Sequence, residues 1–94
     1  MNKITIDFDQ IKNAEMLWGF LNEKLQLDDV IQGWGRNLDA FWDVYSHWDS
    51  EDLFEVINLN KIAKNDFKEY VQKFLKLLED LKKTNPNFNY KIVD

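Results

Sequence analysis

The run LFEVINL at residues 53–59 decides the fold, because it is the best candidate for a strand in the interior of this 94-residue chain. Its β-branched and aromatic side chains favour a β-strand. Residues 60–65 add a turn of helix, and Asn65 or Asp66 caps a long helix that continues to about Lys83. The apolar stripe of this helix has amphipathic spacing and consists of Phe67, Tyr70 or Val71, Phe74, Leu77 or Leu78, and Leu81. After Pro86 ends the helix, the alternation of residues 88–93 predicts another strand.

The N-terminal half predicts one more strand and two more helices. Residues 3–8 alternate between polar and apolar side chains, as a strand does. Residues 14–27 have the period of a helix capped by Asn13, within which Gly19 costs up to about 1 kcal/mol relative to alanine. We expect a loop at residues 28–37 and a short helix at residues 38–48. The order β–α–α–β–α–β predicts an α/β fold, with a small three-stranded parallel sheet packed with three to four helices.

Length and composition bound what the chain can be. A hydrophobic content of 45% and an aromatic content of 15% supply a dense core, so we expect one folded domain over residues 1–94. No stretch approaches the length of a membrane span, and Asp7 comes before any apolar signal segment can form, so we expect a cytoplasmic protein. The absence of cysteine excludes disulfides and thiolate metal sites, and a single histidine leaves few routes to a zinc site or a catalytic triad. We expect no cofactor.

Negative charge is concentrated in one quarter of the chain. Residues 28–52 carry seven acids against Arg36 alone, a net charge of −6, whereas the other 69 residues carry +1. The same window holds three of the four tryptophans. Such a surface repels the phosphates of nucleic acid and attracts a basic protein. We therefore expect a protein partner, with neither nucleic acid nor membrane involved, and a free monomer.

The helix predicted at residues 38–48 places its acids and its apolar side chains on different faces. Leu38, Phe41 and Tyr45 turn into the core, while Asp39 and Asp43 lie one turn apart and Trp42 lies at the edge between them. Two carboxylates at this spacing repel each other, so a solvated acidic face is the simplest interpretation. The pair could instead dock cations of a partner. Acid–base catalysis or a metal site would need a cleft or further converging ligands, which the spacing does not supply.

Three other features of residues 28–52 each have a structural interpretation and a functional one. Trp34 and Trp48 are core residues by default, although aromatic rings beside charges are typical of interfaces. His47 is more typical of a surface or capping residue than of a catalyst. Gly33 and Gly35 lack the spacing of a phosphate loop and would let the chain turn tightly around Trp34.

The run GRNLDAFWD at residues 35–43, followed by Trp48, resembles the barstar family, the intracellular inhibitors of a secreted bacterial ribonuclease. The likeness extends more weakly over the whole chain, in length and in the order of its elements. It implies that Asp39 and Asp43 meet the cationic active site of a basic ribonuclease, with Asp43 in the phosphate pocket. It also implies that Trp42 and Trp48 lie near that face, and that Gly35 and Asn37 lie across the mouth of the enzyme. An acid of the long helix, Glu79 or Asp80, would add a contact.

Three positions depart from the family pattern. Gly33 stands where the loop carries an aromatic residue, although Trp34 could take over the stacking. Arg36 stands where the family often has glutamate, and His47 stands where it has a glycine. The partner could therefore be a different basic toxin or another protein bound by the same fold. The alternative from another class is a small hydrolase that uses Asp39, Asp43 and His47.

Overall fold

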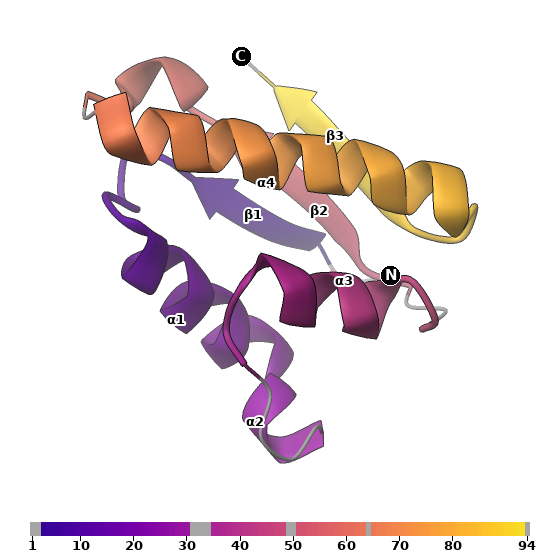
Figure 1. Ribbon diagram of the computed structural model, residues 1–94. Helices are drawn as coiled ribbons and strands as arrows, with labels where there is room; N and C mark the ends of the chain where they lie inside the picture. Colours follow the sequence, from indigo (N-terminus) through magenta and orange to yellow (C-terminus); the bar gives the residue numbers. More distant parts are fainter. Residues whose placement is uncertain (1–2, 31–34, 49–50, 64, 94) are drawn as a thin grey trace.

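The computed structural model describes residues 3–30, 35–48, 51–63 and 65–93. Eight elements follow one another along these segments, in an order close to the predicted one (Figure 1). They are β1 (Lys3–Asp7), α1 (Ala14–Leu25), α2 (Leu27–Val30), α3 (Leu38–Tyr45), β2 (Leu53–Ile57), the 3₁₀ turn η1 (Leu59–Lys61), α4 (Asn65–Thr84) and β3 (Asn89–Val93).

The three strands form one parallel sheet in the order β1-β2-β3. Ile6 of β1 lies beside Val56 of β2, which in turn lies beside Ile92 of β3. Parallel neighbours require crossover connections, and α4 supplies the one between β2 and β3. The predicted three-stranded parallel sheet is thus confirmed.

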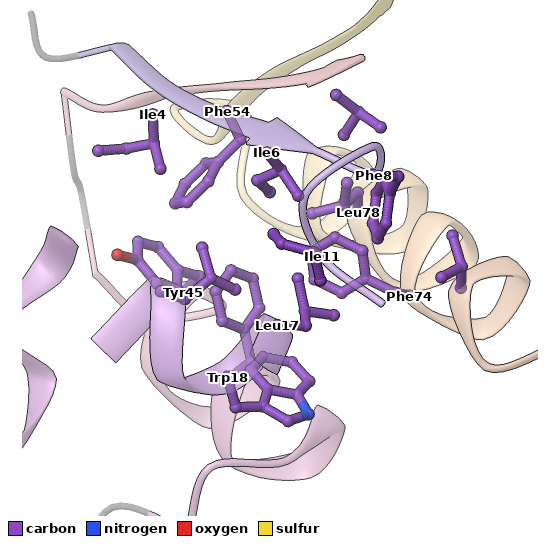
Figure 2. Packing of buried hydrophobic residues seen from close by; sticks show 14 of the residues in the cluster. Ile4, Ile6, Phe8, Ile11, Leu17, Trp18, Tyr45, Phe54, Phe74 and Leu78 are labelled. Atoms are coloured by element: carbon purple, nitrogen blue, oxygen red, sulfur yellow. The ribbon is translucent and has the colours of Figure 1, made fainter. Parts of the chain in front are cut away.

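Helices α1, α3 and α4 lie against one face of this sheet, and the core fills the space between the two layers (Figures 1 and 2). Alternate strand residues supply the sheet side of the core, among them the fully buried Ile6, Phe54 and Val56. Phe41 of α3 is central, with its ring 5.7 Å from those of Trp18 and Phe54. The residues of α3 that are candidates for binding a partner therefore lie on a helix whose other face packs in the core.

The opposite face of the sheet carries polar side chains at its centre. Glu55 of β2 accepts ion pairs from Lys3 at 3.2 Å and from Lys91 at 3.1 Å, so that all three strands are joined. The two ammonium groups, that of Lys91 first, hold the pKa of Glu55 below its ordinary value. A central acid between two lysines thus replaces apolar packing on this face.

The boundaries of several elements differ from the predicted ones. Helix α1 runs unbroken through Gly19 but ends at Leu25, because Gln26 adopts a left-handed conformation with φ of 53°. The next residues form the helical turn α2 where a loop was expected, and this turn begins at the fully buried Leu27. The expectation of a loop over all of residues 28–37 was therefore wrong. The polar composition of the segment predicted a loop and gave no indication that Leu27, near the end of α1, is buried.

Two further elements are shorter than predicted. Helix α3 ends at Tyr45 and not at Trp48, with Ser46 as its C-cap. Strand β2 ends at Ile57, because Asn58 turns the chain in a left-handed conformation and donates a hydrogen bond to the Asp7 carboxylate at 2.8 Å. Within the described segments, none of the helices combines the length and the apolar character needed to cross a bilayer.

Candidate protein-binding surface

Asn37 fixes the beginning of α3. Its Oδ1 accepts a hydrogen bond from the Ala40 N–H at 2.8 Å, which is the N-cap bond, and its Nδ2 donates to the Gly35 carbonyl at 3.2 Å. A Cβ at residue 35 would lie only 3.0 Å from Nδ2, so glycine leaves room for this folded-back amide. Gly35 and Asn37 therefore set the direction in which the loop enters the helix. Asp39 follows in the first turn, where a negative charge suits the helix dipole.

Arg36 lies between these two residues in an unusual backbone conformation. Its φ is 51°, in the left-handed region that costs a residue with a side chain roughly 1–2 kcal/mol. The residue is exposed, and it brings a positive charge to the edge of an acidic surface. Residues with strained backbone cluster at binding and active sites.

The two faces of α3 divide as the periodicity predicts. Phe41 and Tyr45 are fully buried and Leu38 is partly buried against the core. Asp39 and Asp43 are exposed on adjacent turns, and Trp42 between them is half-buried. Neither carboxylate forms an ion pair with the residues that the structure describes. We call Asp39, Trp42, Asp43, His47 and Trp48 the acidic–aromatic surface.

Trp48 extends this surface beyond the end of α3. Its side chain is exposed to 39%, and its ring stacks on that of Tyr45 at 5.6 Å between centroids and 22° between planes. Its carbonyl accepts a hydrogen bond from the side chain of Asn85 at 3.2 Å. His47, the neighbouring residue, is exposed. The expectation that Trp48 is a core residue is therefore wrong, because α3 ends before this residue can turn inward.

Tyr45 connects the surface to the core and carries an unusual polar atom. Its Oη is buried and has no hydrogen-bond partner among the described residues. Burial, with a smaller contribution from the charge of Asp52, raises the pKa of Tyr45 well above its ordinary value. The hydroxyl therefore stays protonated near neutral pH.

The acids of the long helix are engaged within that helix. Asp80 accepts an ion pair from Lys76 at 3.3 Å, and Glu79 accepts one from Lys83 at 3.2 Å. The side chain of Asp80 is 43% exposed, so the ion pair leaves part of it accessible. Trp34 and Gly33, the remaining loop candidates, lie outside the described residues.

The described residues show few features of a catalytic or metal site. The described residues contain no group of three or more histidine, aspartate or glutamate side chains able to hold a metal ion. A hollow of about 600 Å³ lies between the starts of α1 and α4, and residues of α3 do not line it.

Sequence reasoning missed Asn85. The pattern of the sequence predicts only the end of the long helix at the neighbouring Pro86, but the side-chain amide of Asn85 donates to the carbonyl of Tyr45, 40 residues away at the end of α3. A polar residue before Pro86 signals a turn, and nothing in its position along the chain signals a contact with α3. Only the tertiary fold brings the two together.

Together these features define an α/β protein with helices on one face of its sheet and two exposed acids on α3. Comparison with models of protein families matches residues 1–93 to the family described as Barstar (barnase inhibitor). The chain belongs to the barstar family. It is also 31% identical over 80 residues, covering 85% of each chain, to a protein of Bacillus subtilis (strain 168) named "Putative ribonuclease inhibitor YrdF".

Proposed function

We propose that this chain is a protein inhibitor, an immunity protein or antitoxin that blocks the cationic active site of a basic ribonuclease. The observation that carries the proposal is the pair of exposed carboxylates of Asp39 and Asp43, on adjacent turns of a helix whose other face is locked in the core. The family description and the name of the relative both concern ribonuclease inhibition, which supports the proposal. Its site of action is the cytoplasm, and the free protein is a monomer.

The mechanism follows from the chemistry of a ribonuclease. An enzyme that binds RNA has arginine and lysine side chains arranged for phosphates, and carboxylates can take the places of those phosphates through charge-assisted hydrogen bonds. Asp39 and Asp43 repel each other in the free protein, and the cations of the enzyme relieve that repulsion on binding. Trp42 and Trp48 add apolar contact beside the charged groups, where binding energy is usually concentrated. No chemical step is needed, because occupation of the cleft excludes RNA.

One observation favours a second candidate, the same fold directed at a different basic toxin. Arg36 places a positive charge in the loop before α3, where a purely cationic partner would repel it. A partner with an acid opposite Arg36 would fit better. The hydrolase alternative gains no such support, because Asp39, Asp43 and His47 are exposed and residues of α3 do not line the hollows described beside α1, η1 and α4.

The test is inhibition of barnase, the ribonuclease that the family description names. Cleavage of a fluorogenic RNA should stop when the chain reaches a one-to-one ratio with the enzyme. The variant Asp43→Ala should melt at least as high as the parent, because it loses one of two repelling carboxylates, yet should inhibit poorly. Glu69→Ala, which removes an exposed acid from α4, is the control of equal charge and should inhibit normally.

Each outcome separates the candidates. Failure against barnase, together with inhibition of another small basic ribonuclease, favours the second candidate. Normal inhibition by Asp43→Ala moves the binding surface elsewhere, and an unfolded Asp43→Ala makes the residue structural. Absence of inhibition across a panel of basic ribonucleases overturns the proposal.

A further inference from the structure

Asn85 ties the end of α3 to a distant part of the chain. It lies in the turn between α4 and β3 and is 7% exposed. Its Nδ2 donates one hydrogen bond to the Tyr45 carbonyl at 3.0 Å and another to the Trp48 carbonyl at 3.2 Å. Its Oδ1 accepts from the Asn87 N–H at 3.1 Å. Because both amide hydrogens and the oxygen are engaged, the side chain has one orientation and holds both carbonyls at fixed positions.

Trp48 is the residue whose position depends most on its hydrogen bond with Asn85. It lies beyond the last backbone hydrogen bond of α3, which runs from the Ser46 N–H to the Trp42 carbonyl. The hydroxyls of Tyr45 and Ser46 are buried and have no partners among the described residues, so they do not tie this segment to its surroundings. Two specific interactions of Trp48 are described, the hydrogen bond from the Asn85 amide to its carbonyl and the stacking of its indole on the Tyr45 ring.

We propose that Asn85 is a positioning residue of the acidic–aromatic surface, which acts by fixing Trp48 before the partner arrives; the inference rests on the proposed function. A ring that is already ordered loses less entropy when it is buried in a complex. The contacts of a tryptophan form at short range, whereas the acids of α3 act over a distance through their charge. Asn85 therefore sets the rate of dissociation of the complex and leaves the rate of association nearly unchanged.

The experiment compares Asn85→Leu, which is similar in size and neutral, with Val71→Ala, a buried change in the N-terminal half of α4. Association and dissociation rates with barnase are measured for each variant, with and without Trp48→Ala. Asn85→Leu should speed dissociation about tenfold, and Val71→Ala should not. The tenfold effect should disappear in the Trp48→Ala background, because Asn85 acts through that residue. An equal effect in both backgrounds, or an equal effect of Val71→Ala, overturns the inference.

A second measurement needs no partner. In proton–nitrogen NMR spectra, Asn85→Leu should shift or broaden the Trp48 indole signal and the backbone amides of residues 46–48, while those of residues 38–41 stay in place. If the unaltered chain does not inhibit barnase, the proposed function fails for that ribonuclease, and the spectra still decide the position of Trp48. An unchanged indole signal in the folded variant overturns the inference. Should Asn85→Leu not fold, Asn85→Asp takes its place, since it keeps the shape and the acceptor for Asn87.

Discussion

The indole Nε1 of Trp18 donates a hydrogen bond to the hydroxyl of Tyr70 at 2.7 Å, and this bond joins α1 to α4 across the helical layer. The ring of Trp18 packs at the same time against Phe41 of α3 at 5.7 Å and Phe74 of α4 at 5.8 Å. This side chain of α1 therefore contacts both α3 and α4, the other two helices of the layer. The position of α3, and with it the acidic–aromatic surface, depends on this junction.

Replacing Tyr70 with phenylalanine tests the junction. Tyr70→Phe removes the acceptor of the Trp18 indole and keeps the ring, so the free energy of unfolding should fall by about 1 kcal/mol. Chemical denaturation measures the change, and Tyr90→Phe on β3 is the control for loss of a tyrosine hydroxyl. Inhibition should persist, because the Trp18 ring keeps its contacts with Phe41 and Phe74, which hold α3 in place. No loss of stability in Tyr70→Phe would show that the bond contributes little to folding.

Tyr45 should show the opposite behaviour. Tyr45→Phe removes a buried hydroxyl without a partner among the described residues, so the free energy of unfolding should rise by about 1 kcal/mol. The pKa of Tyr45 is raised in the folded protein, so above its ordinary value of 10.0 the unfolded chain releases a proton that the folded protein keeps. The contribution of protonated Tyr45 to the free energy of unfolding is therefore fully present below about pH 10 and is lost as the pH rises above this value. Thermal melts from pH 7 to pH 11 should show a smaller alkaline loss in Tyr45→Phe than in the parent, and a less stable variant would contradict the assignment.

Gly19 offers a stabilising change. It lies inside α1, and a Cβ built on it meets no atom within 4 Å. Gly19→Ala should raise the free energy of unfolding by about 0.5–1 kcal/mol, because alanine loses less backbone freedom on folding and clashes with nothing. Urea denaturation measures the gain. Gly35→Ala is the matched contrast and should destabilise, since its Cβ would press against the Asn37 amide at 3.0 Å.

The faces of α3 could be predicted from sequence because they depend on local geometry. The spacing of residues 38–45 predicts that Phe41 and Tyr45 face inward and that Asp39 and Asp43 face outward. The parallel order of the strands followed from the alternation of strands and helices. These properties are set within a few turns of the chain, where the periods of helix and strand determine which side chains share a face.

The remaining features depend on contacts between distant segments. The early end of α3 and the exposure of Trp48 accompany the bond from Asn85, 37 residues further along the chain. The helical turn α2 begins at the buried Leu27, and the acidic residues that follow Leu27 gave no indication of this burial. The engagement of Asp80 with Lys76 could be read from their spacing of four residues, yet whether the acid also faces the partner could not. Such outcomes are decided by tertiary packing.

Salt should separate the charged contribution to binding from the apolar one. With −6 concentrated in residues 28–52, association with a basic ribonuclease should be steered by charge. The association rate should then fall as ionic strength rises from about 10 mM to 1 M, over which the Debye length shrinks from roughly 30 Å to 3 Å. Dissociation should change much less, because contacts that exclude water are screened less. Stopped-flow rates across this range provide the test, and an association rate independent of salt would contradict steering and weaken the inhibitor proposal with it.

Arg36 provides the test of which partner the surface fits. It opposes the acidic field, so Arg36→Glu should raise the association rate if the partner presents only cations to this loop. Arg36→Gly is the control, because it removes the charge and also suits the left-handed φ of 51°, so it should be the more stable of the two variants. Rates with barnase at low salt should then rank Arg36→Glu above Arg36→Gly and both above the parent. If Arg36→Glu instead slows association or sharply speeds dissociation, the arginine meets an acid on the enzyme. That result would favour a toxin whose rim carries an acid opposite the loop before α3.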